Sequence, residues 1–344
     1  LVHSLTIKLF AEAGVNIVPS LIFSFHVLLA VSLIIGFPFI LSILKATKTS
    51  NVIENLLAGS YQSFNDLVNK WATANISEKE HAKIQQKLFE ELNQLMDLLV
   101  YVPYKEPKAH VVEGIGELLQ HYVKLKHKIP ESLFKINQRI EEDISFRTMK
   151  NLLVEVEKSK TFYEQKSFRL IGNAYNIFLE SGEFDLSSLC AEQLSQVGKT
   201  AIECNDQELI EVITVRMNTY FRFALKHAQH YNEPRNLYNL VFHYGQFLGH
   251  LTESHQVDRV KTCIGHFVFY GQQCFNSISS APSLSFILDV IAFEIQNLLI
   301  NVYKNKWDRE IQKELLIKFL LFDNFQDVDR DFARNFFSQN HGIR

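Results

Sequence analysis

The stretch RLIGNAYNIFLESGEFDLSSLCAEQLSQVG, Arg169–Gly198, decides the fold. Its apolar residues recur every three or four positions on both sides of Gly182, which is the spacing of two amphipathic helices. Gly182 stands where the first pattern stops, because glycine readily adopts the backbone conformation that ends a helix, and Asp185 is the expected cap of the next helix. The sequence therefore predicts a helical hairpin, with small and aromatic residues on its first helix.

This hairpin resembles a tetratricopeptide unit, which is a pair of antiparallel helices. Residues 239–271 repeat it loosely, again with Tyr and Gly in the first helix. Further helix starts follow roughly 20 to 27 residues apart, and one of them is a capping box of Asn205 with Glu208. No fixed period holds, so we predict an all-α chain whose array is an irregular, TPR-like α-solenoid outside any named repeat family.

The composition agrees with an all-α chain. The 344 residues include 7 prolines and 13 glycines, too few for many short strands joined by turns. The 35 basic and 38 acidic residues give a formal charge of -3, so no global positive field would attract nucleic acid. No Cys-x-x-Cys pair occurs, and we expect reduced, mostly buried thiols at Cys190, Cys204, Cys263 and Cys274.

A long apolar segment lies near the start of the chain. The 32 residues between Glu12 and Lys45 include no Asp, Glu, Lys or Arg. Ser20–Leu44 supplies 25 residues, where a bilayer core of about 30 Å needs about 20. We therefore predict a transmembrane helix over residues 19–46, in preference to a buried core helix. The apolar residues of this predicted span are Leu21, Ile22, Phe23, Phe25, Val27, Leu28, Leu29, Val31, Leu33, Ile34, Ile35, Phe37, Phe39, Ile40 and Leu41.

The predicted span divides the chain into four parts. Residues 1–18 would form a short helix or the end of an upstream segment, residues 47–105 membrane-proximal helices, and residues 106–344 the helical array. The boundary near residue 105 falls at a linker with two prolines. Lys45 and Lys48 follow the span closely, and lysines near a span favour the cytoplasmic side. We predict an integral protein of the plasma or inner membrane, with the large C-terminal part in the cytoplasm.

Aromatic residues are frequent in the second half of the chain, at helical spacing. No stripe of Arg and Lys accompanies them, so we expect them to form the core and line a groove for a protein, rather than to stack on bases. Stacked hairpins present an extended concave surface on which such a groove would lie. The candidate groove residues are Tyr238, Phe242, Tyr244 and Phe247.

From these features we expect a membrane-anchored helical scaffold or adaptor that binds a protein partner, as a subunit of a membrane complex. The lipid bilayer and another protein are the expected partners, and a homo-oligomer fits the same architecture. We expect no nucleic acid and no cofactor, and no catalytic motif supports an enzyme. An alternative is a subunit of a multi-span transporter or channel, which would need further spans.

A metal-binding helical enzyme or sensor is another alternative, because histidines crowd residues 227–266. No His-Glu-x-x-His motif occurs among them, so we favour ordinary packing and surface roles for these side chains. They are His227, His230, His243, His250, His255 and His266. The basic run KLKHK, Lys124–Lys128, is interpreted as cations at a helix end, with phosphate or lipid contact as its alternative.

Overall fold

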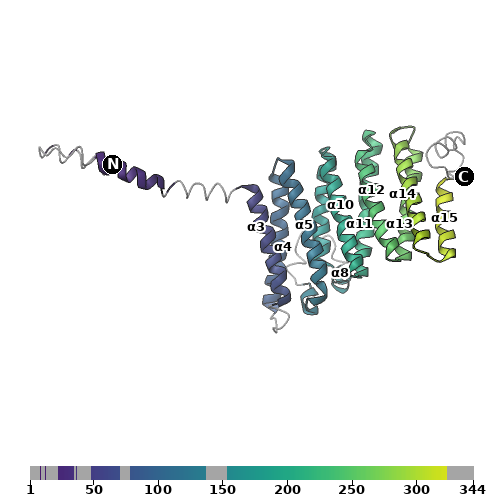
Figure 1. Cartoon of the computed structure of the whole chain (residues 1–344), viewed down its shortest axis with the longest axis horizontal. Coiled ribbons are helices and arrows are strands. Elements are labelled where there is room, and N and C mark those ends of the chain that lie inside the picture. The colour runs from purple at the N-terminus through teal and green to yellow at the C-terminus, as the bar shows by residue number, and fades with distance from the viewer. Residues whose placement is uncertain are drawn as a thin grey trace. The chain divides into compact units, whose positions relative to one another are not determined.

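The computed structural model describes residues 8, 12, 22–34, 36, 48–69, 78–136 and 153–323. Within these ranges every regular element is a helix and no strand occurs (Figure 1). The all-α prediction is therefore confirmed for the described part of the chain. Apolar spacing is the physical reason, since each helix buries one face. On α12 (Arg235–Glu253) that face carries Leu237, Leu240, Val241, Tyr244, Phe247, Leu248 and Leu251.

The chain divides into two compact units, Leu1–Asn55 and Leu56–Arg344. Within the second unit, α4 (Glu78–Tyr101) packs on α5 (Lys105–Leu125) and on α9 (Phe162–Glu180). The domain boundary predicted near residue 105 thus falls inside the second unit. Helices on both sides of it share one core, because their apolar faces cover each other.

Two rows of helices build most of the second unit. In the first row each helix contacts the next, in the order α5, α10 (Phe184–Glu203), α12 and α14 (Leu284–Lys304). The second row is formed in the same way by α9, α11 (Gln207–Tyr231), α13 (Val257–Asn276) and α15 (Arg309–Asp323). Helices that are consecutive in the sequence pack across the two rows and run antiparallel (Figure 1).

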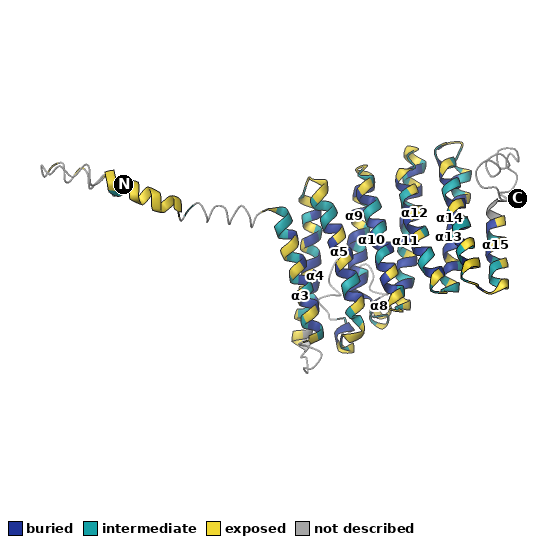
Figure 2. Ribbon diagram, in the orientation of Figure 1, coloured by how far each residue is buried: buried dark blue, intermediate teal, exposed yellow. Residues whose placement is uncertain are grey.

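Between α5 and α9 lie two 3-10 turns, η1 (Lys126–Lys128) and η2 (Glu131–Phe134), and the short helix α8 (Leu153–Lys158). Buried residues recur along the helices of both rows, as the dark blue segments of Figure 2 show. Stacked rings join neighbouring helices in the second row, with 4.2 Å between the ring centroids of Tyr175 and Tyr220.

All four cysteines are free thiols, and the three buried ones are Cys190, Cys263 and Cys274. The prediction of mostly buried thiols is confirmed.

Five helices of the second unit end with the same backbone turn. In each case the second residue after the helix has a positive φ, and these residues are Lys160, Gly182, Asn205, His255 and Lys306. The next N–H donates to a carbonyl five residues back, as in Glu183 to Phe178 at 2.8 Å and Asp206 to Ala201 at 2.9 Å. This is the Schellman motif, which satisfies carbonyls that a helix end leaves unpaired.

The predicted capping box at Asn205 is wrong by one residue. Asn205 terminates α10 in the left-handed conformation. Asp206 caps α11 instead, because its Oδ1 accepts a hydrogen bond from the N–H of Leu209 at 3.1 Å.

The structure describes only part of the predicted span, residues 22–34 and 36. The helix Ile22–Ile34 contains 13 residues, and at 1.5 Å per residue it is about 20 Å long. Its large apolar side chains are exposed, to 71% at both Phe23 and Ile34. The rest of the span lies outside the described residues, including Leu21, Ile35, Phe37, Phe39, Ile40 and Leu41. The transmembrane helix over residues 19–46 therefore stays a prediction, as does the short helix at residues 1–18. Helix α3 (Thr49–Asn69) follows in the chain and crosses the division between the two units.

Candidate functional site

Helices α12 and α14 each present exposed apolar side chains to the same face of the first row. On α14 these side chains are Phe286, Phe293 and Ile300, whose exposed fractions are 51%, 50% and 42%. They lie seven residues apart, which is about two helical turns. On α12 the corresponding values are 40% for Tyr238 and 43% for Phe242. The Tyr238 and Phe286 rings stack at 5.7 Å, so the two sets adjoin. We call these five residues the apolar strip.

A groove of about 460 Å³ lies between α12 and α14 along this strip. Phe242, Phe293 and Ile300 line it. Gly245 and Gly249 form its wall on α12, where a β-carbon added to Gly249 would meet no atom within 4 Å. Gln246, Asn297 and Asn301 also line the groove, so it combines apolar side chains with amide groups and has free space above the α12 backbone at Gly249.

Glu294 brings a carboxylate into this groove from α14. A β-carbon at Gly245 would overlap its Oε2 atom, so the carboxylate lies against the bare α12 backbone. No hydrogen bond or ion pair of Glu294 occurs among the described residues. Burial raises the pKa of Glu294 to about 7. The other titratable side chain that lines the groove is Lys304, at the C-terminal end of α14. The site thus offers apolar contact and one carboxylate without a partner.

The structure separates the four predicted groove residues into two pairs. Tyr238 and Phe242 lie on the exposed strip, whereas Tyr244 and Phe247 are fully buried. The prediction that Tyr244 and Phe247 line a groove is wrong. In a helix of 3.6 residues per turn, positions 238, 242, 245 and 249 share a sector of about 60°, and positions 244 and 247 point to the opposite side. There Tyr244 packs on Phe267, with ring centroids 5.0 Å apart.

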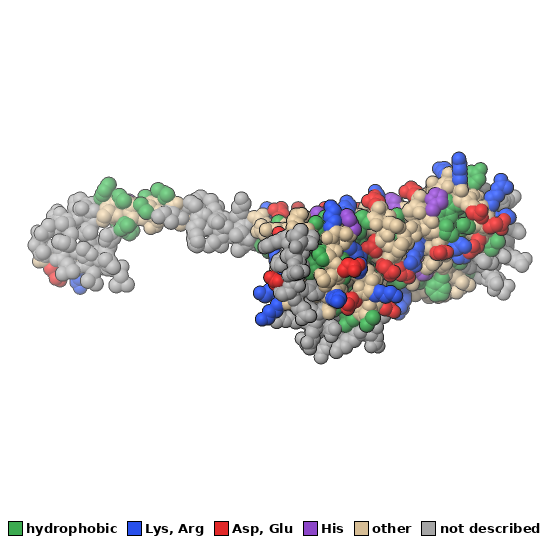
Figure 3. Space-filling model, turned by 90° about the horizontal axis from the view of Figure 1, so that it is seen from below, with side chains coloured by type: hydrophobic (Ala, Val, Ile, Leu, Met, Phe, Trp, Pro, Cys, Tyr) green, Lys and Arg blue, Asp and Glu red, His purple; other side chains and the backbone are tan. Residues whose placement is uncertain are grey.

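The α14 side of the strip and groove was not predicted from the sequence, and its residues are Phe286, Phe293, Ile300 and Glu294. A signal for it is present, since α14 is the one helix in the described ranges that is long and apolar enough to cross a bilayer. It packs against α12, α13 and α15 and still exposes apolar residues on its free face. Hydrophobic side chains are most frequent toward the C-terminal end of the array in Figure 3. Acidic and basic side chains are intermixed over the face shown.

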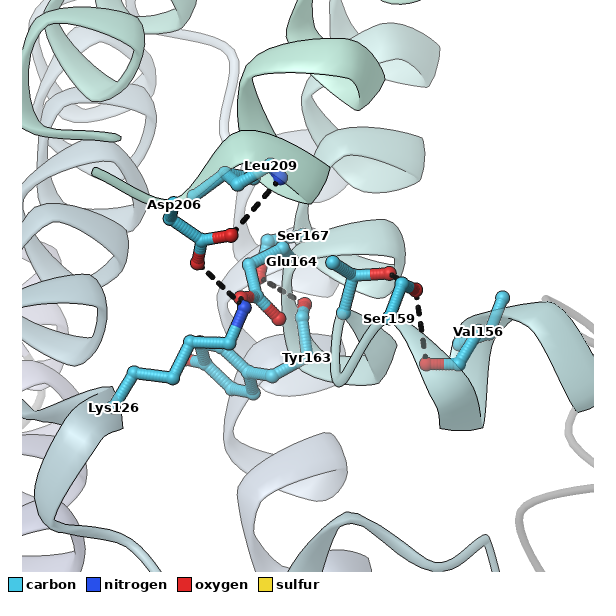
Figure 4. Close-up of polar contacts among 9 residues, drawn as sticks. Lys126, Val156, Ser159, Tyr163, Glu164, Ser167, Asp206 and Leu209 are labelled. Carbon is cyan, nitrogen blue, oxygen red and sulfur yellow. Dashed lines mark hydrogen bonds and ion pairs between the residues drawn. The ribbon is translucent and has the colours of Figure 1, made fainter. Parts of the chain in front are cut away.

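A buried ion cluster is a second notable arrangement (Figure 4). Lys126 Nζ lies 2.7 Å from Glu164 Oε1 and 2.7 Å from Asp206 Oδ2. Burial lowers the pKa of Lys126, but the two carboxylates outweigh this effect and hold the pKa above its ordinary value. Because Asp206 also caps α11, the cluster fixes the end of α5 against α9 and α11. Lys126 therefore has a structural role, and the phosphate or lipid alternative for the KLKHK run loses its central cation.

His227 and His230 both contact the Tyr231 ring, whereas His243, His250 and His266 have separate surroundings. His243 Nε2 lies 3.1 Å from Ser188 Oγ, and Tyr244 Oη lies 2.7 Å from His266 Nδ1. His250 is 3.7 Å from a Glu253 carboxylate oxygen. No group of three His, Cys, Asp or Glu side chains that could hold a metal ion occurs in the part of the chain that the structure describes. The metal hypothesis thus gains no ligand set from these residues.

The chain matches no protein-family model and no curated protein. Among solved structures, it is similar to one described as "Computational Design of Self-Assembling Cyclic Protein Homooligomers". That similarity has a TM-score of 0.33 and 12% sequence identity, over 86% of this chain and 98% of the other. A similarity this low carries no argument about function.

Proposed function

We propose that this protein is a membrane-anchored helical scaffold that binds another protein through the groove between α12 and α14, as a subunit of a membrane complex. The apolar strip is the observation that carries the proposal. Contiguous exposed apolar surface is uncommon on soluble proteins and marks binding sites where it occurs. Here five large side chains are each about half exposed, and three of them, Phe242, Phe293 and Ile300, line the groove.

The arrangement of the two rows supports an irregular α-solenoid of TPR-like hairpins. In a solenoid each hairpin contacts its neighbours, and one row of helices forms an extended binding surface. The groove lies between two successive helices of one row.

The apolar segment over residues 19–46 supports the membrane anchor in this proposal. Its described helix, Ile22–Ile34, exposes its apolar side chains, and lipid would cover them. An anchor would also raise the effective concentration of any partner at the membrane surface. The lysines that follow the segment favour a cytoplasmic array.

Site-specific photo-crosslinking in the native membrane tests this function. Phe293 in the strip and Phe269 on α13 are both about half exposed, so each is replaced in turn by p-benzoylphenylalanine. We expect one discrete crosslinked protein from position 293 and none from position 269. Equal crosslinking from the two positions would show that the strip is ordinary surface and would overturn the proposal.

A further inference from the structure

We propose that the groove binds an amphipathic helix of the partner protein, and that this helix carries one lysine or arginine on its apolar face that pairs with Glu294. This inference rests on the proposed function and names the chemistry of its partner. Three observations support it: the length of the apolar strip, the open space at Gly249 on α12, and the position of the Glu294 carboxylate in the groove.

The length of the strip matches a helix of about four turns. Phe286 and Ile300 are 14 residues apart on α14, so the strip extends about 21 Å along the helix axis. A partner helix of about 14 residues has the same length and presents apolar anchors at successive turns. Gly249 leaves open space in which such a helix can approach α12 closely, whereas the Glu294 carboxylate fills the space at Gly245.

The position of Glu294 determines the charge of the occupant. Its carboxylate lies inside the groove without a partner among the described residues. Lys304 follows ten residues later on α14, about 15 Å along the axis, and is too distant to neutralise it. A helix that covered the groove with apolar or acidic side chains would desolvate this carboxylate without compensation, which is strongly unfavourable. A lysine or arginine on the incoming face would supply the missing hydrogen bonds and charge.

Selection from a defined peptide library tests the inference. The full-length protein in mild detergent micelles is the bait, and the library is a phage-displayed set of 15-residue helix-forming peptides randomised on one face. Enriched peptides are synthesised, and their dissociation constants are measured for the unmodified protein, Gly249→Leu, Glu294→Gln and Gly265→Leu. Gly265 lies on α13 and also has open space around it, so Gly265→Leu is the matched control for Gly249→Leu.

We expect enriched peptides with apolar residues at successive turns and a Lys or Arg beside them. Gly249→Leu should abolish their binding, Glu294→Gln should weaken it at least tenfold, and Gly265→Leu should leave it unchanged. Replacing the basic residue of the peptide by Gln should weaken binding to the unmodified protein by a similar factor, with no further loss on Glu294→Gln.

The contradicting results separate the two proposals. Peptides that lose binding on Gly249→Leu, but lack a basic residue and ignore Glu294→Gln, would overturn the charge pairing and leave the groove intact. Recovery of no peptide, or of peptides that bind Gly249→Leu as tightly as the unmodified protein, would overturn the groove as a helix site. Unfolding curves of all variants verify that each has folded.

Discussion

Glu164 is a fully buried carboxylate, and Lys126 is the cation 2.7 Å from its Oε1 atom. Burial raises the pKa of Glu164, and the Lys126 ammonium only partly offsets this effect. The other carboxylate oxygen, Oε2, is buried without a hydrogen-bond partner. Removing one member of the pair would therefore leave an uncompensated buried charge, even though the intact pair adds little net stability.

Replacing Lys126 by methionine should lower the free energy of unfolding by about 3 to 5 kcal/mol, because Glu164 would lose its cation in a buried site. Lys124→Met is the matched control, since Lys124 is exposed two residues earlier and its loss should change stability by less than about 0.5 kcal/mol. Urea unfolding in detergent measures both variants. Equal stabilities would show that the cluster has no structural role.

The Glu294 carboxylate in the groove makes the free energy of unfolding depend on pH. The pKa of Glu294 is raised from 4.5 to about 7, so its ionisation disfavours the folded state as the pH rises between these values. The cost is absent below pH 4.5 and complete above about pH 7. We expect Glu294→Gln to raise the free energy of unfolding by about 1 kcal/mol at pH 8, a value reduced for partial solvent screening, and by almost nothing at pH 5. A gain of the same size at both pH values would contradict this account.

Long-range partners limited what could be predicted for single residues. Lys126 bonds to carboxylates 38 and 80 positions away in the sequence, so the KLKHK run showed only its position at a helix end. Glu294 likewise lies without an ion-pair partner among the described residues, in space that Gly245 leaves open on another helix. The sequence around Glu294 shows neither feature. Local patterns carry no information about which groups the fold brings together.

Single helices were predicted well, and their ends less well. Apolar spacing placed a hairpin around Gly182, and the structure has α9 and α10 there. Of the six described residues that end helices at positive φ, only Gly182 is a glycine. Asn205 therefore appeared to start a helix, whereas it ends one. The buried face of α12 was also undetermined, because both Phe242 and Tyr244 are aromatic and only the neighbouring helices decide which is covered.

Lys306 offers a test of these helix ends. It follows α14 with φ at 54°, a conformation that costs an L-residue about 1 kcal/mol relative to glycine. We expect Lys306→Gly to stabilise the protein by about 1 kcal/mol and Lys304→Gly, inside α14, to destabilise it by about the same amount. Thermal unfolding midpoints should move in opposite directions. A loss of stability in both variants would exclude the left-handed turn at residue 306.

The proposed membrane anchor concerns the whole molecule. A lysine near the centre of a transmembrane helix costs about 2.5 to 3.5 kcal/mol. The double substitution Leu29→Lys with Leu33→Lys should therefore move the protein from the membrane pellet to the supernatant after alkaline carbonate extraction. Lysines at Ile177 and Val215, which are exposed in the array, should leave it in the pellet. Retention of the Leu29 and Leu33 variant in the pellet would contradict a span over residues 19–46.

The proposed scaffold role depends on the groove between α12 and α14, and quantitative co-purification tests this role most directly. The unmodified protein, Gly249→Leu and Gly265→Leu are isolated from membranes in mild detergent, and the proteins retained by each are quantified by mass spectrometry. We predict a stoichiometric partner on the unmodified protein and on Gly265→Leu, and at least tenfold less of that partner on Gly249→Leu. Equal recovery on the two glycine variants would contradict the assignment of the groove as the binding site.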